Sequence, residues 1–166
     1  MSTSPAAVLN MLSVEAARGA LARCCGSRRW VDAMLAARPF ASPEALHEFA
    51  DRVWATLDRP DFLEAFAQHP AIGARAEALD AWSAEEQARA AASGNADGAS
   101  QLRALNEAYA TRFGYTFIVC ATGKTAEEMV AIAERRLKNG PAKELKVAAV
   151  EQGKITELRL RKLVMR

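Results

Sequence analysis

The 166-residue sequence contains only three cysteines, Cys24, Cys25 and Cys120, and two of them are adjacent. No Cys-x-x-Cys motif and no cysteine–histidine pair has the spacing of metal ligands, so we expect neither a disulfide framework nor a metal site. Apolar runs of the roughly 18 residues needed to cross a membrane are also missing. The amino terminus shows no basic segment followed by an apolar one. We therefore expect a protein of the reducing cytoplasm that makes no membrane contact.

The chain also lacks a strong charge of either sign. Its 22 lysines and arginines nearly balance its 20 aspartates and glutamates, giving a net charge of +2. Such a balance provides no electrostatic footprint for nucleic acid or for an anionic lipid surface. The densest basic run, "ELRLRKLVMR" near the end of the sequence, alternates with leucines. This pattern is typical of a helix with one solvated face, and we expect no nucleic-acid partner.

What the sequence does contain is helical periodicity almost throughout. The clearest case is "SPEALHEFADRVWATL" at 42–57, where Ser42 suits the N-cap and Pro43 the first helical position. Apolar residues then recur at three- and four-residue spacing and predict one buried stripe; they are Leu46, Phe49, Ala50, Val53, Trp54 and Leu57. His47 falls off that stripe, so we expect its side chain to be exposed.

Similar start and stop signals bound the other helices. With 51% hydrophobic and 25% charged residues, the composition is that of a globular protein. We predict an all-α fold, a single-domain helical bundle spanning 1–166 with roughly eight or nine helices. Further helices are expected at 27–39, 61–69, 83–94, 101–114, 125–140 and from Pro141 onward. The polar, glycine-containing stretch at 93–100 is interpreted as a surface loop.

One segment breaks the helical pattern. "YTFIVCA" at 115–121 is a short aromatic and β-branched run after Gly114, and it predicts an extended, buried segment. The sequence offers no second run to pair with it as a sheet. Its backbone N–H and C=O groups therefore need other partners, and a bound ligand is one source of them.

The "ATGKT" stretch at 121–125 has part of a phosphate-binding loop. That motif requires a glycine five residues before Gly123, and this position is Ile118. Without it the backbone cannot wrap a phosphate, so the spacing argues against a nucleotide-dependent enzyme. Thr125 and Glu128 instead have the spacing of a helix capping box.

Ser83 and Glu86 also have capping-box spacing, in "SAEEQ". A glutamate in the first helical turn is held beside the positive end of the helix dipole, where it can also face an adjoining cleft. Gln87 on the same turn offers a neutral donor and acceptor. The structural and the functional interpretation of this block are compatible.

His69 lies at a helix end that Pro70 enforces, because the residue before a proline is pushed out of helical geometry. A histidine in the last turn of a helix is commonly a partner of the helix dipole. The alternative is chemical: Pro70 and Gly73 fix the backbone around an imidazole, the side chain that transfers protons in both directions near neutral pH.

Three blocks resemble, in order, the signature blocks of the OHCU decarboxylase family. They are "HPAIG" (69–73), "SAEEQARA" (83–90) and "LNEAYATRFGYTFIVCATGKTAEEMVAIAERRLKN" (105–139). The full name of the activity is 2-oxo-4-hydroxy-4-carboxy-5-ureidoimidazoline decarboxylase, a step of purine breakdown from urate toward allantoin. The helical pattern fits the family from about residue 5 to the end of the sequence.

The resemblance implies two catalytic residues, His69 and Glu86, which share the proton handling. It also implies six substrate-binding residues, namely Pro70, Ser83, Gln87, Ile118, Val119 and Arg159. Ile118 and Val119 would act through backbone groups. The arginine would meet the substrate's carboxylate or ureido group, with Arg161 as the alternative to Arg159.

The family's reaction requires no metal and no organic cofactor, because the substrate's own conjugated carbonyl and imine accept the electrons that CO2 leaves behind. The expected partners are a ureidoimidazoline substrate and a second copy of the chain in a homodimer. The alternative is a catalytically inactive helical module that binds another protein, with His69 and Glu86 only capping helices. The two differ in whether His69, Glu86 and the 115–121 segment converge on one pocket.

Overall fold

The computed structural model describes residues 3–70 and 96–163, and these form eight helices and no strand. The helices are α1 (Pro5–Met11), α2 (Val14–Cys24), α3 (Arg28–Ala37), α4 (Pro43–Thr56), α5 (Arg59–Phe66), α7 (Ala96–Phe113), α8 (Ala126–Arg136) and α9 (Pro141–Arg161). The prediction of an all-α fold is confirmed. No helix of the described residues is both long and apolar enough to span a bilayer.

Contacts divide the chain into two compact units. The first comprises residues 1–65 and 152–166, and the second residues 66–151, so α9 contributes residues to both. The single domain over 1–166 stays a prediction.

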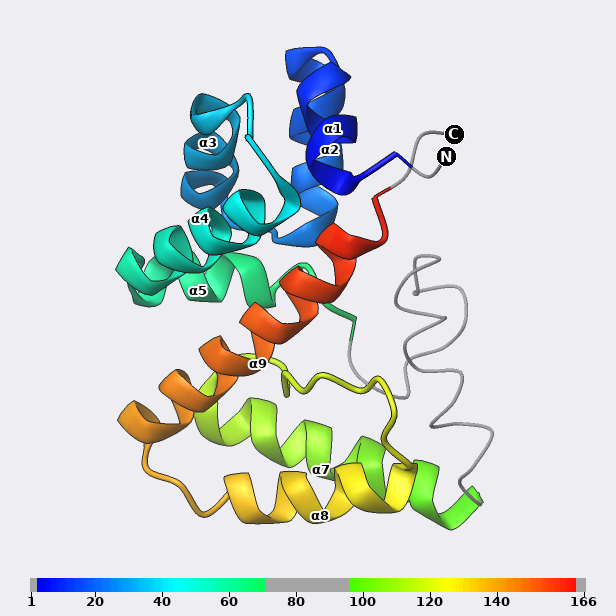
Figure 1. Ribbon diagram of the computed structural model, residues 1–166. Helices are drawn as coiled ribbons and strands as arrows, with labels where there is room; N and C mark the ends of the chain where they lie inside the picture. The colour runs from blue at the N-terminus through cyan, green and yellow to red at the C-terminus, as the bar shows by residue number, and fades with distance from the viewer. Residues whose placement is uncertain (1–2, 71–95, 164–166) are drawn as a thin grey trace. The chain divides into compact units, whose positions relative to one another are not determined.

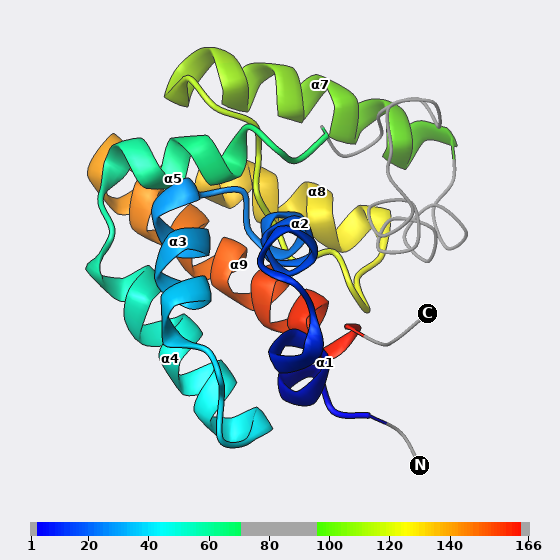
Figure 2. The same cartoon turned by 90° about the horizontal axis from the view of Figure 1, so that it is seen from above.

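The first unit is a helical cluster in which α2 packs on α3, α3 on α4 and α1 on α4; Figure 2 shows these helices from above. Trp30 of α3 lies at its centre, fully buried, and its indole N–H donates to the Ala50 carbonyl of α4 at 3.2 Å. Serine caps open these helices, as the sequence predicts: Ser42 Oγ accepts from Ala45 N at 3.1 Å and Ser27 Oγ from Trp30 N at 3.3 Å.

The apolar stripe of α4 is only partly confirmed. Leu46 and Ala50 are buried, while its other four members are half-buried. The prediction that His47 is exposed is wrong, because its ring is half-buried and its Nδ1 atom is fully covered.

In the second unit α7 and α8 lie side by side, joined by an irregular segment (Figure 1). The predicted loop at 93–100 is wrong where it is described, because residues 96–100 already belong to α7. Small polar residues favour the first turn of a helix as well as loops, so composition alone does not separate the two.

The capping box before α8 is present, with Thr125 Oγ1 accepting from Glu128 N at 3.1 Å.

Gly114 ends α7 in the left-handed region, with a φ of +85°. An added Cβ there would meet nothing within 4 Å, so the requirement for glycine is conformational rather than steric. Gly19, in the middle of α2, also has open space around it but no positive φ.

These two glycines make a matched pair for a stability test. We expect Gly114→Ala to lower the free energy of unfolding by about 1–2 kcal/mol, because alanine is strained in the left-handed region. Gly19→Ala should raise it by about 0.5–1 kcal/mol, since alanine restricts the unfolded chain and favours the helix. Urea denaturation followed by circular dichroism measures both, and equal effects of the two substitutions would contradict the assignment of Gly114.

The three cysteines are free and buried. Burial raises the pKa of the Cys24 thiol to about 12 and that of the Cys25 thiol to about 11. Since the thiolate is the reactive form, a raised pKa leaves both groups neutral and inert at pH 8.

We therefore expect iodoacetamide at pH 8 to modify Cys24 and Cys25 more than about 100-fold more slowly in the native protein than in guanidinium chloride. Peptide mapping by mass spectrometry follows the two sites. Native-state labelling as fast as that of the unfolded chain would show that these thiols are not buried.

Candidate active site

His69 lies just beyond α5, in the second unit. The helix ends at Phe66, three residues earlier than predicted, and the backbone N–H of His69 donates to the Phe66 carbonyl at 3.1 Å. Both His69 and Pro70 are half-buried. The prediction that the chain leaves helical geometry ahead of Pro70 is confirmed.

Aromatic packing brings the start of the irregular segment beside the end of α5. The Phe66 ring is fully buried, and its centroid lies 5.2 Å from that of Tyr115. Tyr109 of α7 packs against both Tyr115 and Phe117, at centroid distances of 5.8 and 5.2 Å. Two expected parts of the site, the turn that carries His69 and the 115–121 segment, therefore share one aromatic cluster.

The segment that carries Ile118 and Val119 is buried, as predicted, and belongs to no helix or strand. Ile118 is 2% exposed and Val119 4%. Protein side chains already bind part of its backbone: Arg136 Nη1 donates to Ile118 O at 2.6 Å, and Lys124 Nζ to Cys120 O at 2.8 Å. The Cys120 N–H donates to a carboxylate oxygen of Glu151 at 3.2 Å. A ligand is therefore not needed for these three groups.

Behind this segment lies a buried ionic cluster. Arg136 of α8 donates to Glu144 of α9 through Nη2 at 2.7 Å and Nε at 3.0 Å, and Glu144 is fully buried. The Tyr109 hydroxyl and the Asn139 amide also donate to the Glu144 carboxylate. Burial raises the pKa of the Tyr109 hydroxyl far above its ordinary value, and its hydrogen bond to Glu144 raises it further, so the group is a neutral donor.

Arg159, the predicted substrate-binding arginine, belongs to the first unit. Its side chain is buried, at 5% exposure, and Nη1 donates to the Arg23 carbonyl at the end of α2, at 2.9 Å. Arg161 is exposed and forms an ion pair with Glu157 at 2.5 Å. The two candidate arginines thus differ in environment, one held in the protein interior and one at the surface.

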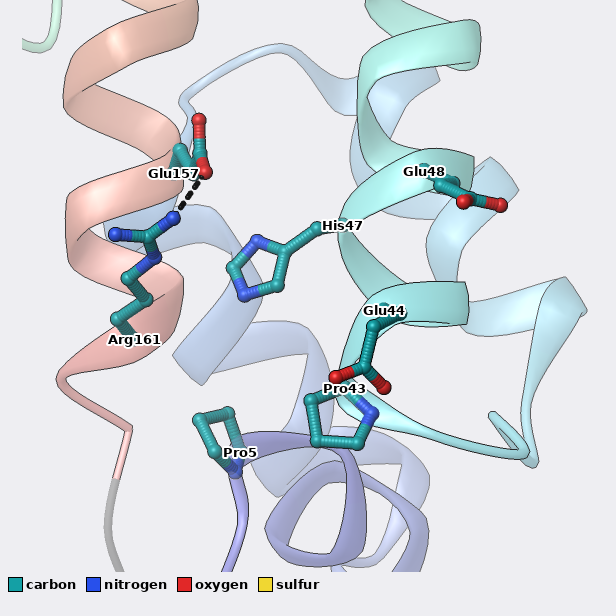
Figure 3. A pocket seen from close by; sticks show the side chains of 7 residues that line it. All are labelled: Pro5, Pro43, Glu44, His47, Glu48, Glu157 and Arg161. Carbon is teal, nitrogen blue, oxygen red and sulfur yellow. Dashed lines mark hydrogen bonds and ion pairs between the residues drawn. The ribbon is translucent and has the colours of Figure 1, made fainter.

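Figure 3 shows a surface hollow of about 550 Å³ in the first unit. It is lined by Pro5, Pro43, Glu44, His47, Glu48, Glu157 and Arg161. The His47 ring points toward the Glu157–Arg161 pair, and its buried Nδ1 has no hydrogen-bond partner among the residues that the structure describes. Of the expected site residues that the structure describes, only the alternative arginine lines this hollow.

Ser83, Glu86 and Gln87 lie outside the described residues, so the convergence of His69 and Glu86 on one pocket stays a prediction. Across residues 3–70 and 96–163, no group of three or more His, Cys, Asp or Glu side chains is placed to hold a metal ion.

Sequence reasoning missed the charged side chains that hold the irregular segment. Arg136 and Glu151 lie in helices rich in charged residues, where a solvated face is the usual outcome. The need for backbone partners in 115–121 was the available signal, but it did not indicate which side chains supply them.

Comparison with known proteins identifies the family. The family model described as OHCU decarboxylase matches residues 10–161. A "Uric acid degradation bifunctional protein TTL" of Arabidopsis thaliana is 38% identical over 145 residues, and the match covers 84% of this chain and 45% of that protein. The 2-oxo-4-hydroxy-4-carboxy-5-ureidoimidazoline decarboxylase of Haloferax volcanii is 31% identical, with 74% and 73% covered.

A solved structure agrees. The crystal structure of an OHCU decarboxylase in the presence of (S)-allantoin matches with a TM-score of 0.78 and 34% identity, covering 91% of this chain and 97% of that one. The chain thus spans nearly the whole of that enzyme but less than half of the Arabidopsis bifunctional protein. On the family model, the curated relatives and the fold together, this chain belongs to the OHCU decarboxylase family.

Proposed function

We propose that the chain decarboxylates 2-oxo-4-hydroxy-4-carboxy-5-ureidoimidazoline to (S)-allantoin in urate breakdown. The observation that carries the proposal is the match, over nearly its full length, to an OHCU decarboxylase solved in the presence of (S)-allantoin. The enzyme is a carboxy-lyase, and its substrate is a small heterocycle.

The reaction requires few reactive groups from the protein. Breaking the bond to the carboxylate leaves an electron pair on the ring carbon, and the adjacent conjugated carbonyl and imine delocalise it. The protein has to turn the carboxylate out of the conjugated plane, stabilise the developing charge and deliver one proton to one face. Protonation from a single side gives the S product.

His69 and Glu86 share the proton transfers in this scheme. Deprotonation of the substrate hydroxyl and a dry pocket around the carboxylate favour release of CO2. The half-buried position of His69 and its restraint by Pro70 and the Phe66 carbonyl support the role of an oriented acid–base group. Ser83 and Gln87 supply neutral hydrogen bonds to the heterocycle.

Arg159 is assigned to the substrate's carboxylate or ureido group. Its burial supports this choice, because a guanidinium shielded from water attracts an anion more strongly than an exposed one. Arg161 is exposed and already paired with Glu157. Ile118 and Val119 are assigned to the same site through their backbone groups.

We also propose that the protein is a cytoplasmic homodimer. Light scattering on the purified protein tests the dimer, since the expected mass is twice that of one chain.

His69→Asn should abolish turnover and leave the fold intact, because asparagine keeps a polar side chain but does not titrate near neutral pH. The unstable substrate is generated in situ from urate, and the chirality of the allantoin formed is followed with and without protein. The chain offers a matched control in its other histidine, His47, and His47→Asn should keep near-normal activity. A His69→Asn variant with near-normal turnover would refute the role.

The wild-type protein decides between the two classes of function in the same assay. Acceleration of (S)-allantoin formation supports the decarboxylase, and its complete absence would favour a helical interaction module.

Arg159→Gln should lower kcat/KM by about tenfold or more, mainly through KM, because one charge-assisted contact to the substrate is lost. Arg161→Gln serves as the comparison and should change kcat/KM by less than about twofold, since exposed ion pairs contribute little. Thermal unfolding of each variant separates loss of binding from loss of fold. The reverse order of effects would assign the contact to Arg161.

A further inference from the structure

The backbone of residues 118–120 is held at three points by charged side chains from outside the segment. Arg136 binds Ile118 O, Glu151 binds Cys120 N and Lys124 binds Cys120 O. We infer that Lys124, Arg136 and Glu151 are positioning residues that fix this segment so that the Val119 peptide groups meet the substrate. The inference rests on the proposed function.

Val119 lies between these bound groups. In an extended chain the N–H and C=O of neighbouring residues point to opposite edges, whereas those of residues two apart share an edge. On one edge Ile118 O and both Cys120 groups are bound, while the Ile118 N–H forms no hydrogen bond with residues 3–70 or 96–163. No hydrogen bond joins the Val119 N–H or C=O to any other residue of 3–70 or 96–163. These two groups, together with those of Phe117, which likewise bind no described residue, therefore lie on the opposite edge.

The held edge has a rigid support. Arg136 is 6% exposed, and its guanidinium donates to the fully buried Glu144 as well as to Ile118 O, while its Cζ lies 4.6 Å from the Phe117 ring centroid. Glu151 is 8% exposed. Because these side chains are packed and hydrogen-bonded before any substrate arrives, the segment pays no ordering cost on binding.

The chemistry of the opposite edge fits the substrate class. One N–H donor and one C=O acceptor on the same residue complement the –NH–C(=O)– unit that a ureido group or an imidazolone ring presents. Backbone recognition of this kind depends on the orientation of the peptide groups, and the three charged side chains set that orientation.

Glu151 offers a matched pair of variants. Glu151→Ala removes the acceptor for Cys120 N–H, and we expect the KM and the Kd for (S)-allantoin to rise about tenfold with a smaller change in kcat. Glu151→Gln keeps an acceptor oxygen at the same place and should restore binding to within about threefold of wild type. Glu157→Ala, on the same helix, is the control and should bind as wild type does. A wild-type KM in a folded Glu151→Ala variant would overturn the inference.

The amide NMR signals of the wild-type protein test directly which peptide groups of the segment are bound. Without ligand, the Cys120 amide should exchange with solvent deuterium more slowly than the Val119 amide. On titration with (S)-allantoin, the Val119 amide signal should shift and its exchange should slow. Fast exchange of Cys120, or no response of Val119 in a protein that binds allantoin, would overturn the inference.

The failure of this inference can be distinguished from the failure of the proposed function. A wild-type protein with neither turnover nor allantoin binding rejects the proposed function, while the exchange rates of Cys120 and Val119 still report on the held edge.

If Glu151→Ala fails to fold, Lys124→Met removes a bond made by a half-buried side chain. Its KM should rise about threefold or more, and an unchanged KM would count against the inference.

Discussion

The packing of the helices in the second unit depends on the buried ion pair between Arg136 and Glu144. It joins α8 to α9, and the Tyr109 hydroxyl adds α7 to the same cluster. Taking two charges out of water is costly, and the pair is tolerable only because further hydrogen bonds satisfy both groups. The remaining guanidinium nitrogen of Arg136, Nη1, is satisfied because it donates a hydrogen bond to Ile118 O. The position of the irregular segment is thus tied to the electrostatics of the core.

This arrangement relates the fold to the proposed chemistry. A decarboxylase whose substrate delocalises its own electrons needs orientation and a dry pocket more than it needs reactive groups. Side chains spread over α8, α9 and their neighbouring loop hold the backbone that would contact the heterocycle, and His69 stands beside the same aromatic cluster. In the proposed scheme, rigid packing on one edge leaves the other edge to bind the substrate.

Much of the fold was predictable because helix signals are local. Ser42 caps α4 and Thr125 caps α8 as the sequence indicated, since each contacts an amide three residues away. The charged clamp was not predictable, because Cys120 and Glu151 are 31 positions apart and only the fold brings them together. The same applies to His47, which lines a hollow together with Glu157 and Arg161 of α9. Motif resemblance named His69, Ile118 and Arg159, and the local pattern predicted the burial of Ile118, but neither indicated that Arg136 binds Ile118 O or that Arg159 binds Arg23 O.

The irregular segment after α7 also has a consequence for protein engineering. Its shape depends in part on residues outside it, because the atoms that hold its backbone at Ile118 and Cys120 belong to side chains at positions 124, 136 and 151. Grafting "YTFIVCA" into another helical scaffold would transfer the amino-acid sequence without the contacts that hold its backbone conformation. A designer who wants a different heterocycle recognised would do better to reshape the supporting arginine and glutamate than to exchange Ile118 or Val119.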